Sequence, residues 1–365
     1  MSFLSIGFAI AASLLSQAAM VAQAPQQPPV PKDPLELVTG DAQPVQDADQ
    51  RAAATNLLLN ARALSNVREY AYDLKTTFVS FGSSEGNWSL EDASPSRGIY
   101  RWTAEGPAYS AVNLFNNRMV YSNQAAGAMP LRLAQVRTAI FFAYPQAGPQ
   151  ASLRTATANL NGVAVRCVLV SHMPQNKTAT GGRLWDESEY CIDPALGLLM
   201  SYSPVPGMYV AYDYSQAIHF HDKVIASKFT ITQAGQTIAE AHTESVTDPG
   251  NLEPAVFQPN GLEKVGVGSL MSQPWEVRTR VTSSRGKASD PIQAVVLEGM
   301  LAPDGRLGEV RVLASSNAGL NQSAEERAAK WKSWESQEDG QPGATPQSHE
   351  VFFTVEFVPR AALGR

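Results

Sequence analysis

The chain has 365 residues, of which 44% are hydrophobic and 17% charged, and its formal net charge is −6. The low charged fraction, with 26 glycines and 24 prolines, favours a turn-rich β protein over a helical one. Lysine and arginine nowhere form runs longer than a pair, so the basic footprint of a nucleic-acid-binding protein is missing and no nucleic-acid partner is expected. The length corresponds to about two domains.

The N-terminus has the pattern of an export signal. Residues 3–22 carry no charge and are rich in alanine, leucine and isoleucine, and Ala22-Gln23-Ala24 gives the small–x–small pattern of a cleavage site. We therefore expect a signal peptide over residues 1–24, cleaved after Ala24, and a periplasmic or secreted protein. The alternative is an N-terminal membrane anchor, because the apolar run is long enough to span a bilayer. Residues 25–47, rich in proline, glutamine and aspartate, predict a flexible linker.

Residues 48–258 predict a β-rich domain that opens with a helix. Alanine and leucine dominate 48–64, and Leu57, Ala61 and Leu64 fall on one helical face. A second helix is expected over 131–146. Val210, Tyr212 and Tyr214 alternate with polar or small residues, as in a half-buried strand. The expected strands are 70–81, 97–105, 109–123, 162–171, 198–204, 208–215 and two runs within 223–246 that flank a hairpin turn at 233–236.

The two cysteines, Cys167 and Cys191, predict one disulfide in an exported chain. Both lie in apolar, strand-like runs, and a glycine-rich stretch lies between them. We expect a hairpin-like excursion closed at its base, with a stabilisation of roughly 3 kcal/mol from the smaller entropy of the unfolded chain. The alternative, a pair of free redox thiols, lacks the C-x-x-C spacing.

Residues 259–290 are expected to be a linker, and residues 291–360 a second, smaller domain. The run 294–316 predicts two strands joined by a turn at Pro303-Asp304-Gly305. Residues 323–334 predict a helix with a capping box formed by Ser323 and Glu326, and 350–357 predict a last strand. The predicted order is β-β-α-β. The last strand, if it lies at the sheet edge, could accept a strand from a partner.

Three sets of side chains are candidates for chemistry or binding. His219 and His221, two residues apart on a predicted strand, could share a metal ion with His242, which would serve a metal-dependent hydrolase; two exposed histidines are the alternative. Glu187 and Glu189 could be a catalytic carboxylate pair or part of a solvated face. The predicted lining of an apolar groove, or else ordinary core, is Tyr70, Tyr72, Phe78, Tyr100, Trp102 and Phe115. The candidates for partner contact in the small domain are Trp331, Trp334 and Phe353.

Two resemblances follow from these patterns. The stretch from Tyr212-Asp213-Tyr214 through 223–246 to Pro-Ala-Val-Phe-Gln-Pro at 254–259, with the opening helix and the short strands, resembles the LolA/LolB-like lipoprotein-carrier superfamily. That resemblance implies a curved, incomplete antiparallel barrel with helices on one side and an apolar concavity that holds acyl chains. The hairpin 294–316, the helix Ala-Ala-Lys-Trp-Lys-Ser-Trp and the strand Phe-Phe-Thr-Val-Glu-Phe resemble the C-terminal domain of the TonB family, which implies a contact with an envelope protein.

The sequence thus predicts an α+β, mostly antiparallel β protein: a curved incomplete barrel with a few helices, plus a small β-β-α-β domain. No cofactor is expected. We expect a non-enzymatic cell-envelope protein that binds a lipid, a lipoprotein or a protein partner in its β domain, and an outer-membrane or other envelope protein through the small domain. The alternative is an envelope scaffold whose large domain has a filled core and no ligand.

Overall fold

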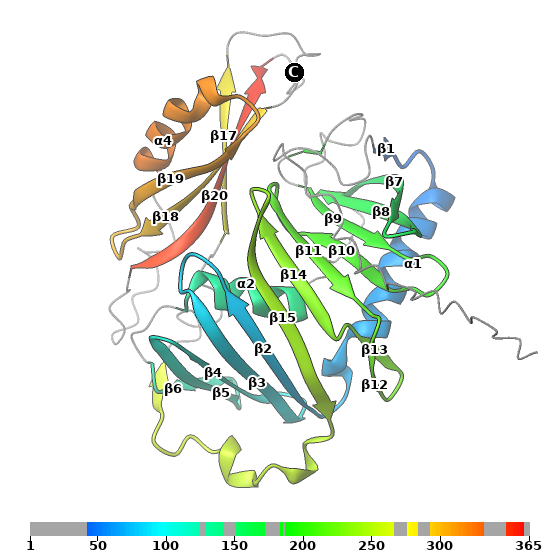
Figure 1. Cartoon of the computed structure of the whole chain (residues 1–365), viewed down its shortest axis with the longest axis vertical. Coiled ribbons are helices and arrows are strands. Elements are labelled where there is room, and N and C mark those ends of the chain that lie inside the picture. The colour runs from blue at the N-terminus through cyan, green and yellow to red at the C-terminus, as the bar shows by residue number, and fades with distance from the viewer. Residues whose placement is uncertain are drawn as a thin grey trace, which may run out of the picture.

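The structure is a computed structural model that describes residues 42–124, 129–141, 151–171, 183–184, 187–265, 276–283, 293–331 and 348–360. A long curved sheet forms the large domain, and a small sheet with one helix lies against one end of it (Figure 1). The predicted fold class, mostly antiparallel β with a curved, open sheet, is confirmed. The N-terminal 41 residues, including the expected signal peptide, lie outside the described residues. No helix in the described part of the chain is long and apolar enough to cross a membrane.

The large sheet is antiparallel throughout, and its two ends do not pair with each other. Its fourteen strands are, in spatial order, β1 (Gln43–Pro44), β7 (Ser152–Leu160), β8 (Val163–Ser171), β9 (Ser188–Ile192), β10 (Leu199–Ser203), β11 (Met208–Asp213), β14 (Lys228–Gln233), β15 (Gln236–Thr247), β2 (Tyr72–Ser80), β3 (Gly86–Ser96), β4 (Ile99–Gly106), β5 (Tyr109–Asn116), β6 (Met119–Ser122) and β16 (Glu263–Val265). A separate hairpin is formed by β12 (Ile218–Phe220) and β13 (Lys223–Ile225). Short 3-10 helices cover Val67–Glu69, Pro249–Asn251, Pro254–Phe257 and Ala318–Leu320.

Two helices, α1 (Ala48–Ser65) and α2 (Leu131–Phe141), cover one face of this sheet, here called the inner face. The prediction of α1 is confirmed: Asp47 caps its N-terminus by accepting a hydrogen bond from the Gln50 backbone N–H at 2.8 Å. The prediction of a second helix is also confirmed, with α2 ending at Phe141; the rest of the predicted range, 142–146, lies outside the described residues.

Turn chemistry explains where the strand predictions hold and where they do not. The run 109–123, predicted as one strand, is two strands, β5 and β6. They are joined at Asn117 and Arg118, whose φ angles of 51° and 66° are those of a tight hairpin turn. The predicted hairpin turn between β14 and β15 is confirmed, with Ala234 and Gly235 at φ 51° and 81°.

The small domain has four strands rather than the expected three. Its sheet order is β17 (Glu276–Ser283), β20 (His349–Pro359), β18 (Gln293–Leu301) and β19 (Leu307–Ser315), with β17 parallel to β20. The predicted order therefore lacked its first strand. The range 259–290, expected as a linker, contains both β16 and β17. The last strand, β20, pairs with β17 on one side and β18 on the other, so the condition under which it could accept a partner's strand, a place at the sheet edge, is not met.

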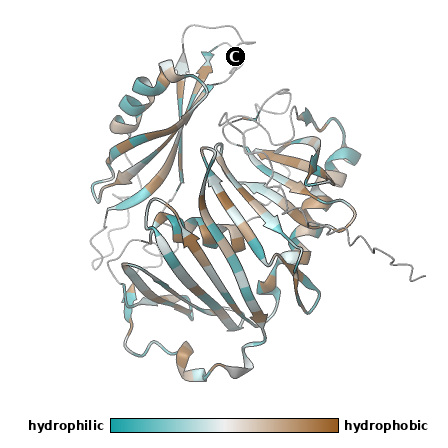
Figure 2. Ribbon diagram, in the orientation of Figure 1, coloured by the Kyte–Doolittle hydropathy of each residue, from teal (hydrophilic) through white to brown (hydrophobic). Residues whose placement is uncertain are grey.

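The helix of the small domain, α4 (Asn321–Lys330), begins two residues before the predicted start. The predicted capping box is wrong, because Leu320 precedes the helix and makes no side-chain cap. The Glu326 side chain instead accepts a hydrogen bond from Gln322 at 3.2 Å. Coloured by hydropathy, α4 is mostly hydrophilic, whereas the strands beneath it alternate between hydrophobic and hydrophilic residues (Figure 2).

Candidate functional site

An apolar pocket lies between the inner face of the large sheet, the ends of the two helices, and the β12–β13 hairpin. Strand alternation turns Leu199, Tyr212 and Phe229 towards it from three neighbouring strands. Val224 and Ile225 of the hairpin, with Ala226 directly after it, form another part of the wall. The complete lining is Ser65, Ala139, Ile140, Leu199, Tyr212, Tyr214, Val224, Ile225, Ala226, Phe229 and Thr243.

The pocket is small, and both of its tyrosine hydroxyl groups are hydrogen-bonded. As a cavity it measures about 50 Å³, and the empty space including its open mouth is about 440 Å³. The Tyr212 hydroxyl donates to the Ala139 carbonyl at 2.7 Å, and the Tyr214 hydroxyl donates to the Leu199 carbonyl at 3.1 Å. The lining residues include no carboxylate, imidazole, amine or thiol. Such a site can bind an apolar group, and the only side-chain polar groups it presents are hydroxyls, which are weak acids and weak nucleophiles unless a neighbouring base activates them.

The hairpin that walls the pocket is fastened to the body of the domain by charged groups. The Lys223 ammonium is buried and contacts the Glu69 carboxylate at 2.6 Å and the Asp222 carboxylate at 3.1 Å. Burial alone would lower the pKa of Lys223, but the bonds to Glu69 and Asp222 outweigh it and raise that pKa. A hydrogen bond with Asp222 raises the pKa of Tyr70, which also stacks on His221 at 4.3 Å between ring centroids.

Helix α2 fills much of the inner face beside the pocket. Arg137 reaches from it to the fully buried Asp92 of β3 at 3.1 Å, and its guanidinium lies 4.2 Å from the centre of the Trp102 ring. Asp92 also accepts a 2.5 Å hydrogen bond from the Tyr72 hydroxyl. Burial is the main cause that raises the pKa of Tyr72, and the charge of Asp92 adds to it. These contacts hold α2 against strands β2 to β4.

The aromatic side chains predicted to line a groove lie elsewhere. Tyr72, Phe78 and Trp102 are buried: Tyr72 and Trp102 contact residues of α2, and Phe78 stacks on Trp88. Tyr100 stacks on Phe115 at 5.2 Å between ring centroids. Tyr70 is partly exposed beside the hairpin. None of the six belongs to the lining of the apolar pocket. The signal that did point to the pocket is the alternation of Val210, Tyr212 and Tyr214, because two of those three residues line it.

The three candidate metal-binding histidines are not brought together. His219 is exposed on β12, whereas His221 lies in the turn after it with φ 53° and contacts Asp248 at 3.1 Å. His242 is exposed on β15. Among the described residues, a group of three potential ligands within 4.8 Å of one another occurs only at Cys167, Glu189 and Cys191.

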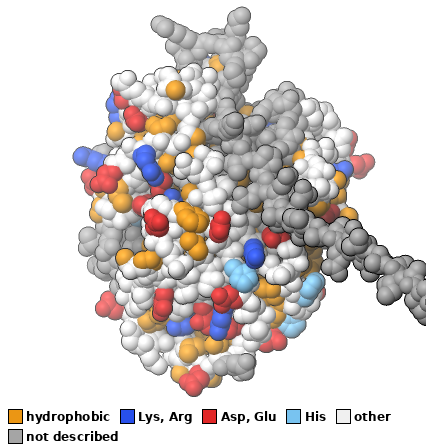
Figure 3. Space-filling model, in the orientation of Figure 1, with side chains coloured by type: hydrophobic (Ala, Val, Ile, Leu, Met, Phe, Trp, Pro, Cys, Tyr) orange, Lys and Arg blue, Asp and Glu red, His pale blue; other side chains and the backbone are white. Residues whose placement is uncertain are grey.

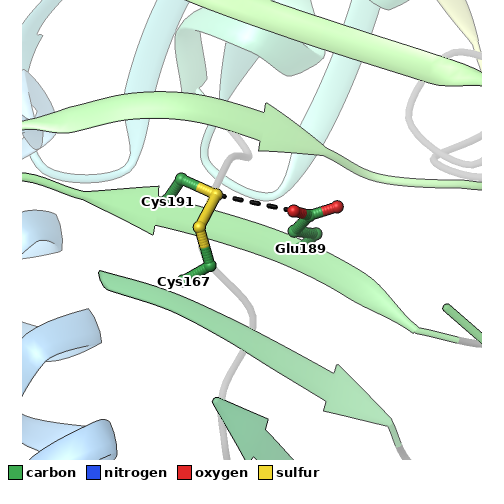
Figure 4. The surroundings of a disulfide bond; sticks show 3 residues. All are labelled: Cys167, Glu189 and Cys191. Carbon is green, nitrogen blue, oxygen red and sulfur yellow. Dashed lines mark hydrogen bonds between the residues drawn. A yellow bond between two sulfur atoms is a disulfide. The ribbon is translucent and has the colours of Figure 1, made fainter. Parts of the chain in front are cut away.

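The predicted disulfide between Cys167 and Cys191 is confirmed. The two residues face each other on β8 and β9, with Cα atoms 3.9 Å apart. The sulfur atoms are therefore not available to a metal. Figure 4 shows the Glu189 carboxylate beside this bond, with Oε1 3.5 Å from Sγ of Cys191.

Glu187 and Glu189 are both 1% exposed, which excludes the solvated face considered for them. The Glu187 carboxylate forms two 2.7 Å bonds with the guanidinium of Arg154, and its Oε2 also accepts from the Leu184 backbone N–H at 2.8 Å. A carboxylate held this way is a structural ion pair of the interior.

Of the candidates for partner contact in the small domain, one is buried, one is partly buried, and one is not described. Phe353 is fully buried in the small core, and Trp331, at the end of α4, packs edge-on against it at 5.4 Å between ring centroids. Trp334 lies outside the described residues. The free edges of the small sheet, as far as the structure describes it, are β17 and β19. On the face seen in Figure 3, acidic and basic side chains are interspersed with small groups of apolar ones.

No family model and no curated protein matches this chain. Among solved structures it is similar to a LolA superfamily protein from Nitrosomonas europaea, with 8% identity, a TM-score of 0.39, and coverage of 56% of this chain and 97% of that one. It is also similar to a putative outer membrane lipoprotein-sorting protein domain from Vibrio parahaemolyticus, with 10% identity, a TM-score of 0.36, and coverage of 57% and 98%. A third is MucB in complex with periplasmic MucA, with 10% identity, a TM-score of 0.23, and coverage of 55% and 57%. At these identities and TM-scores, the likenesses do not assign the chain to a family.

Proposed function

We propose that this is an exported, non-enzymatic cell-envelope protein that binds a lipophilic ligand in the apolar pocket behind the β12–β13 hairpin. The observation that carries the proposal is the chemistry of the lining, which is apolar apart from hydroxyl groups. A pocket of this kind suits an acyl chain or a similar apolar group, and its lining holds no carboxylate, imidazole or amine that would activate the hydroxyl groups.

Export is part of the proposal because of the disulfide. A buried bond between cysteines on paired strands persists in oxidising compartments such as the periplasm and is rare in the cytosol. The uncharged run at 3–22 and the cleavage pattern ending at Ala24 agree with that placement.

The small domain is proposed to contact a protein of the envelope. Its two edge strands, β17 and β19, are eight and nine residues long, and each has one side without a strand partner among the described residues. An extended segment of a partner could pair with either edge by β-augmentation. Cross-linking from residues 276–360, which include both edge strands, should then capture an envelope protein, and deletion of that segment should remove this protein from the partners of the remaining chain.

Two measurements test whether the protein binds a lipophilic ligand: native mass spectrometry of residues 25–365, purified without detergent, and binding of a fluorescent fatty acid. Extra mass that disappears on organic extraction supports the proposal. Ala226→Phe places a ring in the pocket and should weaken probe binding at least about tenfold, because it fills a cavity of this size. Leu196→Phe is the matched control, since Leu196 is 64% exposed and does not line the pocket. Equal probe binding by both variants would contradict the proposed site.

A scaffold without a ligand is the second candidate. It is favoured by the small cavity and by α2, which occupies the inner face that an open concavity would leave free. A bare mass, together with no probe binding by the unmodified protein, would establish this candidate in place of the carrier.

A further inference from the structure

The two faces of the small sheet differ in chemistry although both are buried. The face under α4 is apolar, with Val295, Leu297 and Phe353 among its residues. The opposite face, which lies against the large domain, is half polar. Its fully or nearly buried residues are Ala294, Val296, Glu298, Phe352, Thr354 and Glu356. Permanent interfaces resemble the interior of a domain, whereas contacts between domains that separate are more polar.

A buried polar cluster lies at the centre of this interdomain contact. The Glu298 carboxylate, on β18, meets the guanidinium of Arg132 of α2 at 3.6 Å and that of Arg311 at 3.1 Å. Arg132 also donates to the side-chain carbonyls of Gln135 at 2.9 Å and Gln233 at 3.1 Å. Glu298 and Arg132 are 6% and 2% exposed, so both ions are removed from water by docking.

Two polar contacts flank the cluster. The Ser83 hydroxyl, at the β2–β3 turn, contacts the carboxylate of Glu350 on β20. Arg278 of β17 donates to the Pro204 carbonyl, in the β10–β11 turn, at 2.7 Å. The small sheet thus sits over α2 and over turns at one end of the large sheet (Figure 1). The small sheet also contributes two fully buried apolar side chains, Val296 and Phe352, to the hydrophobic core of the large domain.

Helix α2 has an apolar side and a polar side. Leu133 and Val136 belong to the core of the large domain, whereas Arg132 and Gln135 take part in the polar cluster beneath the small sheet. A helix face that carries a guanidinium and an amide is readily hydrated if the small sheet leaves. A buried ion pair adds little net stability, because desolvation offsets the attraction. Both properties favour a contact that opens.

We propose that the small domain is a detachable cap on α2, which undocks as a unit while both domains stay folded. This inference goes beyond the proposed function and does not depend on the identity of the ligand. Undocking uncovers Arg132, Gln135 and Gln233 and removes the element that holds α2 from outside.

The test compares two neighbouring residues of β18 that are both fully buried. Val296→Cys places a thiol on the face against the large domain, and Leu297→Cys places one on the face under α4. In the full-length oxidised protein, a detachable cap exposes the first thiol by undocking and the second only by unfolding. Iodoacetamide should therefore label the Val296→Cys variant at least about tenfold faster. The native cysteines are paired and do not react.

Arg132→Gln, added to each cysteine variant, removes the charge partner of Glu298 at the interface. It should raise the labelling rate of the Val296→Cys variant at least about tenfold further and leave the labelling rate of the Leu297→Cys variant unchanged. Thr354→Cys and Val355→Cys repeat the comparison on β20, should either β18 variant fail to fold. Equal labelling rates for the two faces, rising together with global unfolding in urea, would overturn the proposal and make the two domains one cooperative unit.

Discussion

Arg137 is the residue whose removal should most weaken the large domain. Its guanidinium meets Asp92 at 3.1 Å, and the two side chains are 9% and 0% exposed. Asp92 also holds the Tyr72 hydroxyl, and the guanidinium lies over the Trp102 ring. Arg137→Met keeps an unbranched side chain of similar length but leaves a buried carboxylate without this partner.

The expected decrease in the unfolding free energy of the Arg137→Met variant follows from this geometry. Two charges 3.1 Å apart attract by about 5 kcal/mol at an effective dielectric constant of about 20. Measured losses on breaking buried pairs are roughly 3–5 kcal/mol, because the remaining ion stays desolvated. Arg68 acts on the neighbouring Tyr72 hydroxyl and remains close, which places the expected loss at the lower end, about 3 kcal/mol. The double variant Arg137→Met/Asp92→Asn should lose less than the single one, since it no longer buries a charge.

The assay is urea unfolding of the oxidised protein, followed by tryptophan fluorescence. Arg306→Met is the matched control, because Arg306 and Asp304 form an ion pair with side chains 66% and 59% exposed. An exposed pair contributes at most about 1 kcal/mol. If Arg137→Met costs no more than Arg306→Met, α2 is not held by its buried charge, and the reasoning fails.

Three further predictions concern stability. Replacing Cys167 and Cys191 by alanine should lower the unfolding free energy by roughly 3 kcal/mol, since the bond closes a loop with a sequence separation of 24 residues. Burial, aided by the nearby charge of a glutamate, raises the pKa of Asp73 above 3.8. The folded state therefore keeps this proton to higher pH than the unfolded chain, and the associated stability is lost as pH rises through the folded pKa. Asp73→Asn should thus gain stability relative to the unmodified protein between pH 3 and pH 7. Gly106→Ala should cost roughly 1–3 kcal/mol, because the new methyl group would lie 2.4 Å from the Trp88 ring.

Each of these has a measurement that can contradict it. Urea unfolding with and without a reductant should separate the unmodified protein from the cysteine variant only in the absence of reductant. Urea midpoints measured across the pH range should show a growing advantage for Asp73→Asn, and a constant difference would refute the raised pKa. Gly250→Ala is the control for Gly106, because nothing lies within 4 Å of its new methyl group.

Local sequence patterns predicted much of the secondary structure. The alanine- and leucine-rich run gave α1, and period-two alternation gave strands such as β11 and β20. The disulfide pairing was also predictable, because a chain with only two cysteines has one possible intramolecular pairing. Two of the wrong predictions, the single strand over 109–123 and the capping box of the last helix, also have local causes. A turn of Asn117 and Arg118 without glycine was not recognised, and Leu320 precedes α4 where Ser323 was expected to cap it.

The strand β17 was missed for a non-local reason. Val277, Thr279 and Val281 alternate with arginines, yet the segment lies among glycines, prolines and serines that favoured a linker. What makes it a strand is parallel pairing with β20: Glu276 pairs with Phe352, which lies 76 residues further along the chain. Parallel strands need a long connection, so no nearby turn reveals their pairing.

Composition and local patterning were enough to predict a mostly β protein with one disulfide, few charges and no recognisable catalytic motif. Which inner-face side chains are covered could be seen only in the folded chain. Tyr72 and Trp102 are core because α2 lies over them, whereas Tyr212 and Phe229 line a pocket because the β12–β13 hairpin leaves space beside them. Strand alternation fixes the face on which a side chain lies, but whether that face is filled depends on elements that are distant in the chain.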